Sequence, residues 1–222
     1  MQAEILVPDT LSEITLEQYQ KFLKIQENNE DETFLAIKMI EIFCGIRGDT
    51  IMKMKASSIR DITGILTDMF NQKPPLVREF TMKGKEYGFI PKLEDMSFGE
   101  YVDLDTYMGD IENIHKAMAV LYRPITQKYN DKYLIEEYEG ENEQIMLDMP
   151  MDAVLSSIIF FYNLGMDLSK AMLNSLQQEE NKDLVQQLTL EKNGDGINQY
   201  IHLQKEMYSK LTKLQELIYT RR

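Results

Sequence analysis

The chain has 222 residues, of which 43% are hydrophobic and 27% are charged, and its formal net charge is −13. Such a composition supports a globular fold whose hydrophobic core needs neither disulfides nor metals for stability. The negative charge argues against nucleic acid or an anionic membrane as the main partner, because both attract clusters of Lys and Arg.

The single cysteine, Cys44, lies in the apolar run MIEIFCGI, and one thiol cannot form an intrachain disulfide. We interpret Cys44 as a small core residue and expect a reducing compartment. The first ten residues lack the basic and apolar regions of a signal peptide, and the apolar run at 153–164 is too short to span a bilayer. We therefore expect a soluble protein.

Three helices are predicted within residues 15–70. Thr15 and Gln18 have the spacing of a capping box at the start of the first helix, and Gly45 is suited to end the second. The prolines of the stretch 73–75 break the third. The residues expected on the inner faces are Leu16, Tyr19, Phe22, Leu23, Phe34, Ile37, Ile40, Phe43, Ile59, Ile62, Leu66 and Met69.

A β-hairpin is predicted near residues 80–90. Apolar residues alternate with polar ones on both sides of Lys83-Gly84, and glycine accepts the positive φ of a tight turn. A lone hairpin is marginal in water, so we expect it to pack on the helical body or to pair with another chain. Ser97 and Glu100 then form a second capping box, which starts a new helix.

The rest of the chain is predicted to be mainly helical, apart from the less regular stretch 128–140, where a short strand is one interpretation. One helix is expected over 111–122, with Pro124 ending it, and a long one after Pro150, where Gly165 bends the helix or ends its first half. A polar stretch separates this body from a last segment, 197–222. There, apolar residues recur at spacings of three and four, which is typical of a coiled-coil stripe.

The predicted fold is therefore mainly α: a multi-helix body with one small β-hairpin insertion and a C-terminal amphipathic helix. Residues 1–178 form the body with the hairpin near 80–90, and residues 179–222 form a polar linker and the amphipathic helix.

Catalytic and cofactor motifs are missing from the sequence. Two histidines and one cysteine do not supply a zinc site, and the loop EKNGDGINQY lacks the twelfth-position glutamate of a calcium loop. Phosphate-binding glycine motifs and nucleophile elbows are absent. We therefore expect no enzyme activity, no cofactor and no metal.

Acidic residues crowd the region 94–110, and we interpret most of them as a solvated face. We interpret His115 as a surface or buried hydrogen-bonding residue. Arg123 follows a helix, where a cation interacts well with the helix dipole, and it can also pair with the acidic run. We expect its role to be structural.

Two segments, GKEYGFIPKLEDMSFGEYVDLDTY and HKAMAVLYRPI, resemble segments of tail assembly chaperone-like proteins of tailed bacteriophages. The resemblance covers roughly residues 15–168 and implies a morphogenesis protein that binds the long apolar helices of a tape-measure protein until the tail tube forms. It implies no catalytic residues. The matching residues are Tyr87, Phe89, 98–101, 103–105, 115–118, 121–124 and 160–165.

Two hypotheses of function follow. In the first, the protein is a tail assembly chaperone that acts in the host cytoplasm, and its partner is a tape-measure helix. In the second, it is a structural virion component, such as a ring or connector subunit, and the hairpin pairs edge to edge with a neighbouring subunit. Both allow a homo-oligomer. The residues expected to contact partners are Phe160, Phe161, Met207, Leu211, Leu214, Ile218, Tyr87 and Phe89.

Overall fold

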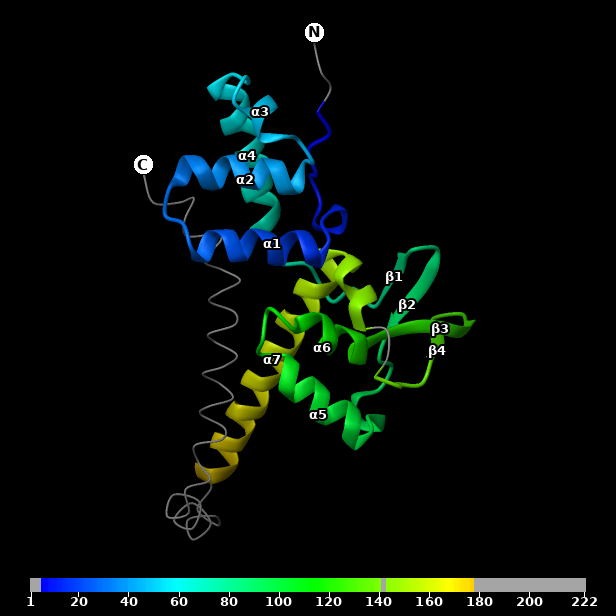
Figure 1. The fold of residues 1–222 in the computed structure, drawn as a ribbon. Helices are drawn as coiled ribbons and strands as arrows, with labels where there is room; N and C mark the ends of the chain where they lie inside the picture. Colours follow the sequence, from blue (N-terminus) through cyan, green and yellow to red (C-terminus); the bar gives the residue numbers. More distant parts are fainter. Residues whose placement is uncertain (1–4, 141–142, 178–222) are drawn as a thin grey trace.

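The computed structural model describes residues 5–140 and 143–177, and Figure 1 shows two packed regions in this part of the chain. The first region is helical. Its elements are the short 3-10 helix η1 (Leu11–Glu13), α1 (Leu16–Glu27), α2 (Glu32–Phe43), α3 (Gly48–Ile51) and α4 (Ala56–Phe70).

The helix signals of this region are confirmed. The Thr15 side chain accepts from the backbone N–H of Gln18, and the Gln18 side chain accepts from the backbone N–H of Thr15. Gly45 follows α2 with a φ of 66°, the left-handed conformation that glycine adopts at helix ends. The face of α2 differs from the prediction, because Leu35 and Met39 are buried, whereas Phe34 is only half-buried.

Four aromatic rings hold this region together. Phe43 packs against Phe22 and Phe70, with ring centroids 5.4 and 5.0 Å apart, and Tyr19 lies 5.8 Å from Phe70. Tilted ring pairs of this kind add to the stabilisation from burial alone. The cluster therefore connects α1, α2 and α4.

The second region contains a four-stranded antiparallel sheet with the order β1-β2-β3-β4. Its strands are β1 (Glu79–Met82), β2 (Lys85–Phe89), β3 (Tyr122–Tyr129) and β4 (Lys132–Ile135). The predicted hairpin is β1–β2, and its turn is confirmed by the φ angles of Lys83 (50°) and Gly84 (76°). The prediction of an isolated hairpin is wrong, because β3 pairs with the other edge of β2.

Pro124 explains why β3 escaped prediction. Proline has no N–H, so it is rare inside a sheet. Here Pro124 lies opposite Tyr87, and its carbonyl accepts from the N–H of Glu136 on the β4 side. The nitrogen of Pro124 also faces β4, and the pairing of β3 with β4 is irregular there, between Ile125 and Gln127. The lack of an N–H at Pro124 therefore costs the sheet little hydrogen bonding.

The helices of this region lie beside the sheet. They are the 3-10 helix η2 (Leu93–Asp95), α5 (Phe98–Tyr107), α6 (Ile114–Leu121), the 3-10 helix η3 (Glu143–Asp148) and α7 (Met151–Gln177). The helix predicted over 111–122 begins later, and the chain enters β3 directly after Leu121. Gly165 does not end α7, which continues to Gln177.

The two regions share one hydrophobic core. The N–H of Leu16 donates to the carbonyl of Met149 over 2.9 Å, and the N–H of Met151 donates to the carbonyl of Ile14 over 2.8 Å. These bonds join the start of α1 to the start of α7, and buried apolar residues form one cluster from Leu11 to Phe161. Within the described residues, no helix is long and apolar enough to cross a membrane.

Candidate interaction surfaces

Four of the residues expected to contact partners pack against the core. Tyr87 and Phe89 are buried, and so is Phe161, whereas Phe160 is half-buried. Phe89 lies 5.7 Å from Phe160 and 6.4 Å from Phe161, measured between ring centroids. The hairpin therefore packs on α7. A partner can contact Tyr87 or Phe89 only if the hairpin separates from the core.

A buried tyrosine of β3 links the segment before β1 to α7. The Tyr122 hydroxyl donates to the carbonyl of Val77 over 2.6 Å and lies 2.8 Å from Ser157 Oγ. Ser157 Oγ in turn donates to the carbonyl of Ala153. Burial raises the pKa of Tyr122 well above its usual value, so the hydroxyl stays neutral and acts as a hydrogen-bonding group.

The other predicted partner contacts, Met207, Leu211, Leu214 and Ile218, lie outside the described residues, as do the polar linker and the amphipathic helix.

Sequence reasoning missed the exposed apolar residues of α5. Phe98 is 82% exposed, Tyr101 is 57% exposed and Val102 is also exposed. Their spacing of three and four places them on one face of the helix, and we call these three residues the α5 ridge. Exposed apolar residues are ordinary when scattered, but three large ones on one helix face are typical of a binding surface.

A signal for the ridge was present in the sequence. Leu104 and Met108 form a second apolar pair, and both are buried. Leu104 and Met108 follow Tyr101 by three and seven positions, so the apolar residues form one broad stripe, wider than a surface helix needs to pack on its own protein. The pair faces the core, which leaves Phe98, Tyr101 and Val102 without cover within the part of the chain that the structure describes.

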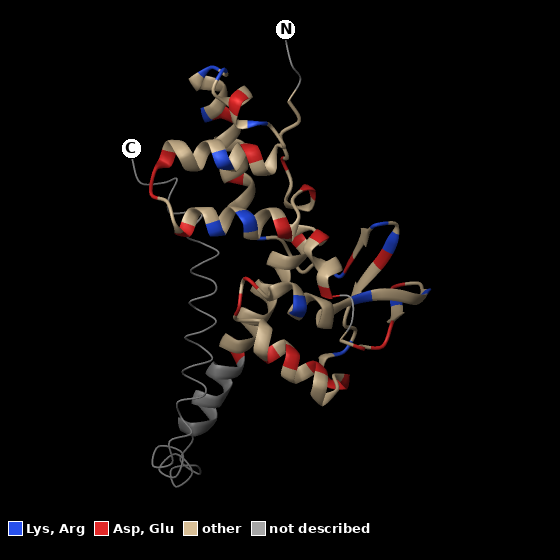
Figure 2. Ribbon diagram, in the orientation of Figure 1, with Lys and Arg blue, Asp and Glu red and all other residues tan. Residues whose placement is uncertain are grey.

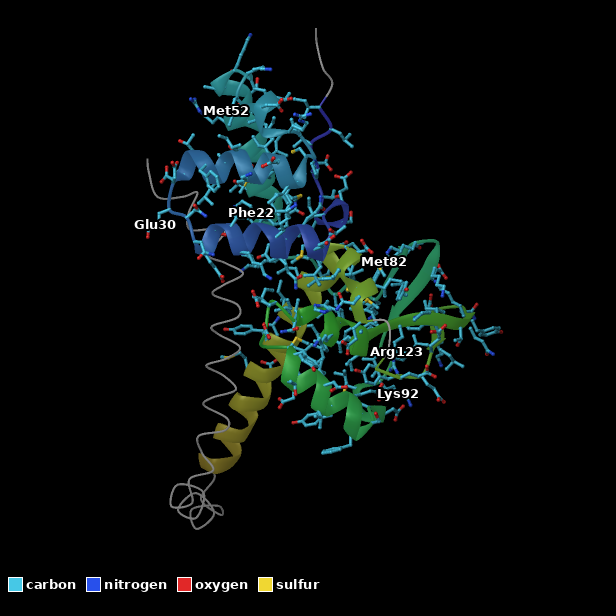
Figure 3. The ribbon with its side chains drawn as sticks, viewed as in Figure 1. Phe22, Glu30, Met52, Met82, Lys92 and Arg123 are labelled. Atoms are coloured by element: carbon cyan, nitrogen blue, oxygen red, sulfur yellow. The ribbon has the colours of Figure 1, made fainter. Side chains whose placement is uncertain are left out.

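A buried ion pair joins α5 to the sheet. Glu100 Oε1 lies 2.8 Å from Arg123 Nη2, and both side chains are nearly buried. The other oxygen of the same carboxylate, Oε2, accepts from the backbone N–H of Ser97 over 2.6 Å, which completes the predicted capping box. Arg123 therefore has the structural role expected of it, and Figure 3 shows it where the sheet faces α5.

Further contacts fix α5 in place. The Tyr138 hydroxyl donates to Asp103 Oδ2 over 2.8 Å, and Lys116 Nζ lies 4.7 Å from the centre of the Tyr107 ring. The acidic run is thus not uniform. Glu100 is buried and Asp103 is half-buried, whereas Glu94, Asp95 and Asp105 are exposed, as expected of a solvated face. The ridge therefore lies on a helix that these contacts anchor and that carries exposed acidic residues.

The environments of His115 and Cys44 shift the pKa values of both side chains. Burial lowers the pKa of His115, and the neighbouring Lys116 lowers it further; its Nε2 lies 3.3 Å from Gln144 Nε2. Burial raises the pKa of the Cys44 thiol to about 11, which keeps it protonated. No group of three His, Cys, Asp or Glu side chains in residues 5–140 and 143–177 is arranged to hold a metal ion.

Comparison with known proteins supplies no relative for this geometry. No protein-family model matches the chain, and neither a curated protein nor a solved structure matches it. The similarity to tail assembly chaperone-like proteins stays a hypothesis, carried by the sequence segments described above.

Proposed function

We propose that the protein is a non-enzymatic morphogenesis factor, most similar to tail assembly chaperones, which holds an amphipathic helix of a partner on the α5 ridge. The observation that carries the proposal is the exposure of Phe98 and Tyr101 on one face of a helix that is anchored on its other face. Aromatic residues in such positions are frequent binding hot spots.

The chemistry of the partner follows from the surroundings of the ridge. Asp105, one turn after Tyr101 and Val102, is exposed, and red residues run along α5 in Figure 2. A helix that carries Lys or Arg beside its apolar stripe fits this surface, because the apolar residues are buried and the charges attract. The resemblance implies that a tape-measure protein supplies this helix.

The test is co-expression of the full chain with the tape-measure protein of the same gene block, followed by isolation of the complex. The double variant Phe98→Asp and Tyr101→Asp is expected to weaken the complex by roughly 100-fold, because two apolar anchors are lost. Met52→Asp is the matched control, since Met52 is a comparably exposed apolar residue in the other region. An unchanged complex in the double variant contradicts the proposal.

A structural virion component is the second candidate, and the edges of the sheet favour it. Within the described residues, β1 and β4 each have only one neighbouring strand. β2 is paired on both sides, so the hairpin offers only β1 for pairing with another subunit. Mass spectrometry separates the two candidates: many copies in purified particles support the structural role, whereas abundance in infected cells alone supports the chaperone.

A further inference from the structure

The sheet is basic although the protein is acidic. Residues 76–92 and 122–135 carry seven Lys or Arg and three Asp or Glu, whereas the whole chain carries 24 and 37. Figure 2 shows blue residues along these strands. Positive charge concentrated in one module of a negative protein marks a surface that attracts acidic groups.

Internal ion pairs neutralise four of the seven cations. These pairs are Lys83 with Asp148, Lys92 with Asp95, Arg123 with Glu100, and Lys128 with Glu79 and Glu86. The three others are Arg78, Lys85 and Lys132; all are exposed, and none has an ion-pair partner within residues 5–140 and 143–177. Their charges are available to a ligand.

Two of these three cations, Arg78 and Lys132, line one groove, which has a volume of about 630 Å³, and Lys85 is not among its lining residues. β4 forms one wall, and the segment from Ile90 to Asp95 contributes another part of the lining. Apolar side chains also take part, and Leu134 is 60% exposed at this position. Asp131 and the paired carboxylates of Asp95 and Glu100 line the groove as well. The groove therefore combines an apolar lining with a small excess of positive charge.

The backbone of β4 is open on this edge. A two-residue turn joins Tyr129 of β3 to Lys132 of β4. In such a hairpin, Lys132 exchanges backbone hydrogen bonds with Tyr129, and Leu134 exchanges them with Gln127. The N–H and C=O of Tyr133 then point away from β3. In the described part of the chain, no strand pairs with them.

The Tyr133 side chain is fixed independently of this edge. Its hydroxyl donates to the carbonyl of Phe89 over 2.7 Å, and its ring lies over Gly88, where a Cβ would be 2.4 Å from a ring carbon. β4 is thus held across the hairpin by its side chain. The outward-facing backbone groups of β4 are therefore held in position before any partner binds.

We propose that this groove binds an extended, acidic segment of a partner protein, which adds a strand to β4 and places its carboxylates near Arg78 and Lys132. Strand addition uses the open N–H and C=O groups of an edge strand, and adjacent pockets select the side chains. Nucleic acid fits less well, because few cations are free and the lining is partly apolar. The site is separate from the α5 ridge and does not depend on the function proposed for it.

The experiment uses the full chain labelled with ¹⁵N and three probes. The first is a blocked hexapeptide that alternates glutamate with valine, the second alternates lysine with valine, and the third is a decamer of deoxythymidine. The glutamate peptide is expected to bind and to shift the backbone amide signals of Tyr133 and Ile135. The lysine peptide is expected to bind at least about tenfold more weakly, because it is repelled by the free cations.

Paired variants locate the binding. The double variant Arg78→Glu and Lys132→Glu is expected to bind the glutamate peptide at least about tenfold more weakly. Lys21→Glu with Lys53→Glu makes the same change in net charge at exposed positions outside the groove, and it is expected to leave the affinity within about twofold. Phe98→Asp is expected to leave peptide binding unchanged, so a failure of the α5 proposal is distinguished from a failure here.

Three results overturn the proposal. They are no binding of the glutamate peptide, equal losses in the two paired variants, and tighter binding of the decamer than of the peptide. The last result assigns the groove to single-stranded nucleic acid.

Discussion

The hairpin β1–β2 and helix α5 are neighbours in the sequence, and both carry aromatic residues at regular spacing. In the hairpin these residues are covered, and Phe89 is only 5% exposed. On α5 they are open, as the exposure of Phe98 shows. Regular spacing identifies residues that share a face, but it does not tell whether another element covers that face.

The difference arises from the number of neighbours around each element. β2 lies between β1 and β3, and its aromatic residues also meet α7. The packing of α5 runs through its inner face, where Glu100 meets Arg123 and Leu104 is buried. The hairpin therefore serves stability, whereas the outer face of α5 is free for recognition.

Shortening one aromatic side chain in each segment gives the largest contrast. Phe89→Ala is expected to lower the free energy of unfolding by about 3–5 kcal/mol, because it leaves a cavity beside Phe160 and Tyr122. Phe98→Ala is expected to change it by less than about 0.5 kcal/mol, because the ring is exposed. Urea unfolding of both variants measures this, and equal losses would place Phe98 in a core.

The buried ion pair gives the next largest effect. Glu100→Gln leaves the Arg123 guanidinium without its counter-charge, and we expect a loss of about 3 kcal/mol in the free energy of unfolding. Asp105→Asn on the same helix is the control, with an expected change below about 0.5 kcal/mol. Adding Arg123→Met to Glu100→Gln is expected to restore part of the loss, and purely additive losses would contradict a direct pair.

Two glycine substitutions compare the same segments through the backbone. Gly88→Ala displaces the Tyr133 ring and breaks its hydrogen bond to Phe89, so we expect a loss of about 1–3 kcal/mol. Gly99→Ala on α5 meets no atom within 4 Å and favours the helix, so we expect a gain of up to about 1 kcal/mol. Thermal unfolding measures both, and a stable Gly88→Ala protein would show that Tyr133 is not fixed in solution.

The smallest expected effect is the contribution of His115, in α6, to the pH dependence of the free energy of unfolding. The pKa of His115 in α6 is lowered, first by burial and then by Lys116, so the folded protein binds the proton less tightly than the unfolded chain does. Its neutral form therefore supports stability above the ordinary pKa of 6.5, and this contribution falls as the pH drops below that value. His115→Gln is expected to flatten the decline in unfolding free energy measured between about pH 7.5 and pH 5.5.

Local signals in the sequence were reliable where the interaction itself is local. The capping boxes at Thr15 and Ser97 join residues three positions apart, and the hairpin turn at Gly84 depends on the conformation of two residues. The mainly helical fold could be expected for the same reason. The ion pair of Arg123 with Glu100 joins residues far apart in the sequence, and it could be expected only from their opposite charges. The four-stranded sheet could not, because β3 contains Pro124 and a bulge, which hide the alternation of a strand.

The amino-acid sequence alone thus determined the capped helix starts at Thr15 and Ser97 and the turn of the first hairpin, because capping and turn geometry act over a few residues. Long-range packing determined which faces are covered. It buried Tyr87 and Phe89, exposed the ridge on α5 and gathered cations around β4, since each outcome depends on segments that meet only in the folded chain.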